Sequence, residues 1–267
     1  MRLPQELIDG IIDRLSDDRQ MLKTCSLVAT TWLPRSRLHL FNKISLNNER
    51  AGRWCSAIRP GPDGVARLVR TFTLQQAPTH LWLGTKYLDA ISDHFSSFRH
   101  VENLSVTWLD LSDFKPGSLA RHFAHFGSSL RSLHLSYVSA NYSTLITFLQ
   151  LFPCLGELFI HSPDLCDDNP PPRVSRTAPL FRGFLNIEFF NSTSSSFVSH
   201  LACLDLRFSS ISAFNCHFSS GFPLTNLLEA SSLSLRSLEL GTITFCGLFS
   251  FHSPRHDVIN PLPSQIH

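Results

Sequence analysis

Apolar residues recur at helical spacing at the start of the chain. Pro4 suits the first position of a helix, where its missing N–H group is not needed. The residues that follow predict one wide apolar stripe, formed by Leu7, Ile8, Ile11, Ile12 and Leu15. Such a stripe must be covered, either by the segments that follow or by a second protein.

Two more helical patterns follow within the first 42 residues. Ser16-Asp17-Asp18 is a turn and N-cap cluster, and the second helix that follows has its apolar positions at Met21, Leu22, Cys25, Val28 and Ala29. A third pattern starts near Thr30 and Thr31, which can cap it, and contains Trp32, Leu33, Leu38, Leu40 and Phe41. Modules this small rarely bury enough apolar surface to be stable alone. The pattern leaves two interpretations open: the helices cap the rest of the chain, or they dock on a partner.

From residue 65 a short signature, apolar-x-x-apolar-x-apolar, recurs along the chain. It occurs as VRTFTL (69–74), VENLSV (101–106), LRSLHL (130–135), LGELFI (155–160), FLNIEF (184–189), LACLDL (201–206) and LRSLEL (235–240). Its central residues, Phe72, Leu104, Leu133, Leu158, Ile187, Leu204 and Leu238, are 32, 29, 25, 29, 17 and 34 residues apart. Most of these intervals lie near the repeat length of leucine-rich repeats. The pattern predicts an α/β fold, an irregular solenoid of short parallel strands that return through helices such as 143–152.

Strand alternation predicts which side chains face outward. On three successive strands these are Ser132, His134 and Ser136, then Glu157, Phe159 and His161, then Asn186, Glu188 and Phe190. Two aromatic residues one repeat apart indicate an anchor for a target protein, and the candidate target-binding residues are His134, Phe159, His161, Glu188 and Phe190. A register slip of one residue would instead bury both phenylalanines.

The remaining segments complete the predicted organisation. Residues 1–42 form the helical module, 43–64 a linking segment with a helix around 50–58, and 65–252 the repeat region. Loops at 162–179 and 192–196 interrupt the repeats. The Pro-rich and His-rich tail at 253–267 has no periodicity and is expected to be disordered.

Composition narrows the class of protein. Of 267 residues 43% are hydrophobic, which excludes general disorder, and 23 Lys and Arg against 21 Asp and Glu give no strong field toward nucleic acid or membrane. Glu6 and Asp9 interrupt what would be the apolar core of a signal peptide. The seven cysteines are scattered and form no Cys-x-x-Cys pair, so reduced thiols are expected. Together these features predict a cytoplasmic or nuclear protein that binds neither nucleic acid nor membrane.

No catalytic motif is present in the sequence. It contains no Gly-x-Ser-x-Gly elbow, no His-Glu-x-x-His pair, no phosphate-binding loop and no dinucleotide-binding glycine pattern. His122 and His125, or His252 and His256, could pair on a metal, but neither pair has a third ligand nearby in the sequence. We therefore expect no catalytic residues, no cofactor, no metal site and no enzymatic activity of the chain itself.

Residue identities in the first 42 positions resemble the F-box. That family opens with Leu-Pro-x-Glu, contains a central Val-x-x-x-Trp and ends on an aromatic residue. Here Leu3-Pro4-x-Glu6, Val28 with Trp32, and Phe41 occur in that order over residues 2–42, while Gly10 inside the first helix departs from it. The irregular repeats resemble those of F-box proteins, which include families expanded in fungi.

The resemblance implies a function in protein degradation. F-box modules dock on a Skp-family adaptor, which links them to a cullin in a ubiquitin ligase complex, and the rest of the chain binds the target protein. The matching adaptor-binding positions are Leu3, Pro4, Leu7, Ile8, Ile11, Leu15, Leu22, Val28 and Trp32. The expected function is therefore that of a non-catalytic substrate-recognition subunit with an unknown target protein. The alternative is a scaffolding repeat protein whose N-terminal helices only cap the solenoid.

Overall fold

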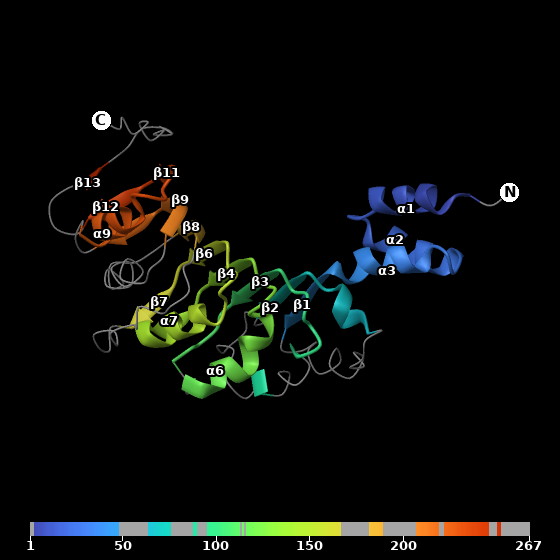
Figure 1. Ribbon diagram of the computed structural model, residues 1–267, viewed down its shortest axis with the longest axis horizontal. Helices are drawn as coiled ribbons and strands as arrows, with labels where there is room; N and C mark the ends of the chain where they lie inside the picture. The colour runs from blue at the N-terminus through green and yellow to red at the C-terminus, as the bar shows by residue number, and fades with distance from the viewer. Residues whose placement is uncertain are drawn as a thin grey trace.

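The computed structural model describes residues 3–47, 64–75, 88–89, 95–112, 114, 116–166, 182–188, 207–218, 222–245 and 250–251. Within these ranges the fold is mixed α/β. Three N-terminal helices are followed by a parallel sheet whose end strands do not pair with each other, so the sheet is open (Figure 1). That coarse architecture is the one predicted from the sequence.

The N-terminal helices are α1 (Gln5–Arg14), α2 (Arg19–Val28) and α3 (Leu33–Asn42). Asp18 caps α2 as predicted, because its carboxylate accepts a hydrogen bond from the Met21 amide at 2.9 Å. The expected cap at Thr30 and Thr31 is wrong: Trp32 occupies the N-cap position of α3 and its side chain makes no capping bond. The chain continues from α3 directly into the first strand.

The eight strands of the sheet follow one another in chain order. They are β1 (Lys43–Asn47), β2 (Thr71–Gln75), β3 (Asn103–Thr107), β4 (Ser132–Ser136), β6 (Glu157–His161), β8 (Arg182–Glu188), β9 (Arg207–Phe214) and β11 (Ser237–Leu240). Every neighbouring pair in this sheet is parallel. The sheet therefore begins at Lys43, inside the segment expected to be a linker, and the helix expected around 50–58 lies outside the described residues.

The strand register aligns one inward residue from each strand. This row contains Ile44, Phe72, Leu104, Leu133, Leu158, Leu185, Ile211 and Leu238. Two predicted positions are corrected, because Leu185 replaces Ile187 in the row and Ile211 of β9 takes the place expected for Leu204. Leu158, Leu185, Ile211 and Leu238 are thus spaced by 27, 26 and 27 residues, and the irregular interval of 17 disappears.

Helices cover the inward face of the sheet. They are α6 (Pro116–Phe123), α7 (Tyr142–Gln150) and α9 (Phe222–Ser231), with short 3-10 turns η1 (Val65–Leu68) and η2 (Ala124–Phe126). Figure 1 shows α6 and α7 on the same side of the sheet. The helix predicted at 143–152 corresponds to α7, which Asn141 caps by accepting a hydrogen bond from the Thr144 amide at 2.8 Å.

Buried phenylalanine rings fill the space between helices and sheet. Phe72 on β2 lies 5.0 Å from Phe98 and 5.6 Å from Phe95, measured between ring centroids, and Phe123 of α6 meets Phe148 of α7 edge-on at 5.0 Å. All five side chains are essentially inaccessible to solvent. Aromatic pairs in such geometries add to the free energy gained by burying their area. The described part of the sheet thus has a continuous apolar core that is separate from that of the helical module.

A one-residue turn ends several of the strands at the same position. Trp108, Tyr137, Ser162 and Asn215 each follow a strand and have φ values of 63°, 53°, 46° and 53°. Beyond the turns lie the short strands β5 (Ser139–Asn141), β7 (Asp164–Cys166), β10 (Cys216–Phe218), β12 (Ile243–Phe245) and β13 (Ser250–Phe251). β5 pairs with β7, and β12 pairs with both β10 and β13. Positive φ is unusual for bulky side chains, so its recurrence marks a repeated structural unit.

Of three other expected segments, the described residues include only part of one. The loop predicted at 162–179 contains β7, while its residues from 167 on, the loop at 192–196 and the tail at 253–267 lie outside the described residues. None of the described helices combines the length and hydropathy needed to cross a membrane.

Candidate functional site

The first candidate surface is the exposed apolar side of the helical module. On α1, Leu7 and Ile11 are 55% and 43% exposed, whereas Ile8 and Ile12 are 6% and 0% exposed. Residues four apart lie on the same face of a helix, so Leu7 and Ile11 form one outward apolar strip that Leu3 extends. On α2, Met21 and Val28 are also exposed and lie seven residues apart. The module therefore has a closed core and an uncovered apolar surface.

The structure divides the nine predicted adaptor-binding residues into three groups. Leu3, Pro4, Leu7, Ile11 and Val28 are exposed, and Leu15 and Trp32 are partly buried. Ile8 and Leu22 are buried in the small core of the module together with Ile12. We correct the prediction for these two: they hold the helices together, and their side chains are not available to a partner.

Exposed apolar residues were also missed by the sequence interpretation. They are Met21, Leu27 and Leu38. Met21 is one of the apolar positions that predict α2, and Leu27 lies outside that set. Packing within the module does not explain a leucine with an exposed fraction of 86%. An apolar residue outside a helix's core-facing stripe is the signal that could have identified Leu27.

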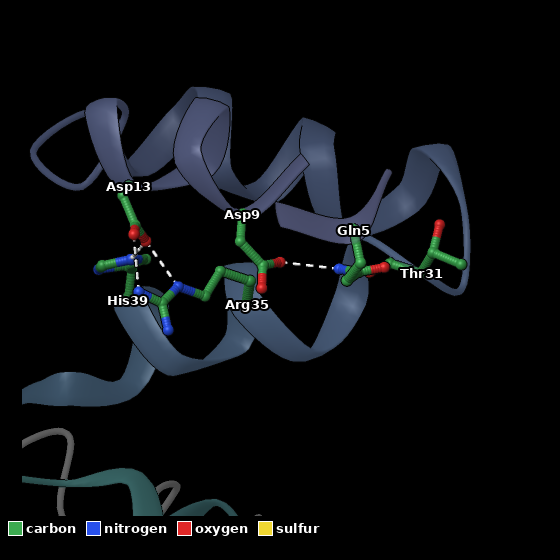
Figure 2. A network of polar contacts seen from close by, with 6 residues as sticks. All are labelled: Gln5, Asp9, Asp13, Thr31, Arg35 and His39. Carbon is green, nitrogen blue, oxygen red and sulfur yellow. Dashed lines mark hydrogen bonds and ion pairs between the residues drawn. The ribbon is translucent and has the colours of Figure 1, made fainter. Parts of the chain in front are cut away.

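A polar network fixes α1 against α3 (Figure 2). Arg35 donates from Nε and Nη2 to the two carboxylate oxygens of Asp13, at 2.6 and 2.7 Å, and His39 Nε2 lies 2.7 Å from Asp13 Oδ1. The hydrogen bond from Arg35, followed by that of His39, lowers the pKa of Asp13 well below its usual range. Near the other end of α1, Gln5 Nε2 donates to Asp9 Oδ1 at 2.7 Å and to the Thr31 carbonyl at 3.2 Å.

This network joins α1, the helix that carries the exposed strip, to α3. A two-pronged Arg–carboxylate pair is more directional than a single contact between point charges. Arg35 and His39 are four residues apart and so lie on one face of α3, which is a spacing that the sequence interpretation did not use. Because Asp13 is 40% exposed, we assign the network a positioning role and attribute little stability to it.

The second candidate surface is the outward face of the sheet. Its middle row runs through Ser45, Thr73, Ser105, His134, Phe159, Asn186, Ser212 and Glu239. The first three strands contribute only small polar residues to this row, and aromatic residues begin at β4. Phe159 lies between buried Leu158 and Ile160, so the register slip that would have buried Phe159 does not occur.

Stacked rings define the centre of this face. The rings of His134 and Phe159 are 4.0 Å apart between centroids and 13° from parallel, and Phe159 lies 5.4 Å from Phe184. The structure thus brings together two of the predicted target-binding residues, and it adds Phe184, which the sequence interpretation missed. Phe190 lies outside the described residues. We call His134, Phe159 and Phe184 the aromatic centre.

The other two predicted target-binding residues lie at the strand ends. His161 Nδ1 is 3.4 Å from Glu188 Oε2, and His161 Nε2 is 3.3 Å from the Tyr137 hydroxyl. Tyr137 in turn stacks on Trp108, with ring centroids 4.4 Å apart and planes within 7°. Trp108, Tyr137, His161 and Glu188 come from four successive units of the sheet, and we call them the aromatic rim.

Burial lowers the pKa of His134 below its ordinary value of 6.5, with Glu157 opposing the shift. A histidine with a lowered pKa takes up a proton more readily in the unfolded chain than in the folded one. Its contribution to stability is therefore complete above about pH 6.5 and declines as the pH falls toward the pKa of the folded state.

We expect an NMR titration of the His134 ring to give a midpoint below 6.5. We also expect His134→Gln to lose less unfolding free energy than the wild type between about pH 7.5 and pH 5.5. A midpoint at or above 6.5 would contradict the burial of this ring.

The described residues include no group of three His, Cys, Asp or Glu side chains that could hold a metal ion. His122 is buried, with Nε2 3.3 Å from Asp89 Oδ1, whereas His125 is exposed, so these two do not converge on one site. His252 and His256 lie outside the described residues.

Comparison of the sequence with protein-family models gave no match, and no curated protein matched it. Functional conclusions therefore rest on the residues and contacts described above.

Proposed function

We propose that the chain is the substrate-recognition subunit of a Skp-cullin-F-box type ubiquitin ligase. The N-terminal helices act as the F-box and dock on a Skp-family adaptor, which brings in the cullin. The remainder acts as a leucine-rich-repeat solenoid that binds a target protein. Ubiquitin transfer itself belongs to the partner proteins, and the chain has no catalytic role.

The observation that carries the proposal is the exposed apolar strip of α1. Leu3, Leu7 and Ile11 are large apolar side chains that remain open to solvent although the module has a closed core of its own. Apolar surface of this kind on a small domain is typical of a protein-binding site. The residue order Leu3-Pro4-x-Glu6 and Val28 with Trp32 gives the strip the sequence pattern of an F-box.

The outward face of the sheet supports the second half of the proposal. Aromatic residues are enriched at the energetic centres of protein interfaces. In this chain six of them, Trp108, Tyr137, His134, Phe159, His161 and Phe184, gather over the strands from β3 to β8. The target protein is placed on this face, and not on the helices that cover the other side.

The test is complex formation between the full chain and a purified Skp-family adaptor. We expect a one-to-one complex by size-exclusion chromatography with light scattering, and recruitment of a cullin when one is added. A chain that stays monomeric with the adaptor, while its melting transition shows it to be folded, would overturn the proposal. That outcome would favour the alternative, a scaffolding protein whose helices cap the first strand of the sheet.

A further inference from the structure

The aromatic rim runs across the sheet just where the strands end. Thr107, Ser136, His161 and Glu188 occupy the last row of strand register, and Trp108 and Tyr137 follow the first two of these. The rim is accessible, since Trp108 is 38% exposed and the Glu188 side chain 43% exposed. It is distinct from the aromatic centre, whose residues lie two positions earlier on β4 and β6 and four positions earlier on β8.

The geometry of the rim suits a planar cation. Trp108 and Tyr137 stack within 7° of parallel, so each ring covers one face of the other, and Tyr137 also meets the edge of His161. A planar ligand can therefore reach the stack at the exposed part of Trp108. Guanidinium groups stack on aromatic rings by cation–π attraction, best on tryptophan, and they also pair with carboxylates. Glu188 supplies a carboxylate at the far end of the rim, where His161 contacts it.

The charges around the rim point to the same ligand. Beyond the turns, strand pairing sets Ser139 between Asp110 and Asp164, each two residues after a turn residue, so two acidic residues follow the turns. Asp110 Oδ1 accepts hydrogen bonds from the Ser112 amide and hydroxyl. Residues 107–112, 136–141, 161–166, 214–218 and 240–245, which form the described strand ends and turns, contain no Lys or Arg. An acidic or phosphorylated segment would therefore meet repulsion here, whereas a basic one is attracted.

We propose that the aromatic rim binds an extended, arginine-bearing segment of a partner protein. Trp108, which Tyr137 supports from its other face, receives one guanidinium group, and Glu188 receives a second. Three strand spacings separate β3 from β8, which is about 14 Å, and an extended peptide covers that distance in roughly four residues. The favoured ligand thus has two arginines about four positions apart. This inference states which chemical groups the rim binds. It rests on the proposed function in one respect only, namely that the protein supplying the segment is the target of the ligase.

The probe is an acetylated and amidated peptide, Gly-Arg-Gly-Ser-Gly-Arg-Gly, titrated into the full chain without adaptor and followed by NMR. Citrulline replaces arginine in a matched peptide, which keeps the shape and removes the charge. We expect the arginine peptide to bind at least fivefold more tightly than the citrulline peptide, and the difference to shrink as salt is added. Equal binding of the two peptides, or tighter binding of an otherwise identical phosphoserine peptide, would overturn the proposal.

Two variants locate the site. Trp108→Asn removes the ring but keeps a residue that tolerates positive φ, as Asn215 does at the equivalent turn, and Glu188→Gln removes the charge. Each is expected to weaken the arginine peptide about fivefold with little change in melting temperature. The control is Gln75→Ala, because Gln75 lies in the same register row on β2, one strand outside the rim. If both variants bind like the control, the rim is not the site. The adaptor takes no part in this measurement, so its result is independent of the test of ligase function.

Discussion

Leu7→Asp and Ile11→Asp are each expected to abolish binding of the Skp-family adaptor while leaving the chain folded. Both side chains are exposed in the free module, so a carboxylate at either position stays in water there. In the complex the same carboxylate would be desolvated against an apolar surface without a partner, which costs several kcal/mol. Co-purification with the adaptor measures the loss, and circular dichroism shows whether the helices remain.

Two further substitutions make this experiment specific. Arg19→Asp introduces the same side chain at an exposed position at the start of α2, on the side away from Met21 and Val28 and two turns before Leu27, and it should bind the adaptor normally. Ile12→Asp replaces a side chain with no exposure and should unfold the module itself. Normal adaptor binding by both Leu7→Asp and Ile11→Asp would remove the F-box proposal, because no other described strip of α1 is both apolar and exposed.

The strand positions were largely predictable because side chains alternate between the two faces of a strand, which leaves few ways to bury the apolar residues of each signature. Signatures such as LRSLHL and LGELFI have one arrangement that buries their apolar residues, and the structure adopts it in β4 and β6. FLNIEF admits two, since either Phe184 or Leu185 can lead inward. The structure selects Leu185, which pairs with Leu158 of β6 in regular register. A register shift between Gly183 and Phe184 occurs only in the pairing with β9, where Ser209 is skipped. A Cβ atom at Gly183 would overlap the carbonyl of Gly156, so this close approach depends on a glycine that the signature does not include.

The candidate surfaces were predictable only as far as side-chain direction follows from period. The helical pattern identified Leu7 and Ile11 but could not separate them from Ile8 and Leu22. A wide apolar stripe can pack against the module core on one side and face a partner protein on the other, and the sequence does not show where one side ends. His134 and Phe159 were found because both lie on strands with fixed alternation. Trp108 and Tyr137 were missed because they follow the strands, in turns where φ is positive. Bulky residues rarely adopt positive φ, so the sequence gives no reason to expect such turns at these two positions.

Phe72→Ala is expected to destabilise the sheet domain by about 3 to 5 kcal/mol, the usual cost of removing a fully buried phenylalanine. Phe72 has no exposed surface, and its ring meets those of Phe95, Phe98 and Phe126 at 5.6, 5.0 and 6.0 Å between centroids. These partners come from segments between β2 and β4, so the cavity would open where strand and returning segments meet.

Urea unfolding of the full chain, monitored by near-ultraviolet circular dichroism, measures this effect. Because folded domains are stable by only about 5 to 15 kcal/mol, the variant should unfold at a much lower urea concentration. Phe72→Leu keeps most of the apolar volume and should lose much less, and Thr73→Ala, which points outward from the next position, should change stability by no more than about 0.5 kcal/mol. If Phe72→Ala were no worse than Thr73→Ala, the inward register of β2 would be wrong. The outward face that carries the aromatic centre and the aromatic rim would then be wrong too, because β2, β3, β4, β6 and β8 pair in one unbroken register.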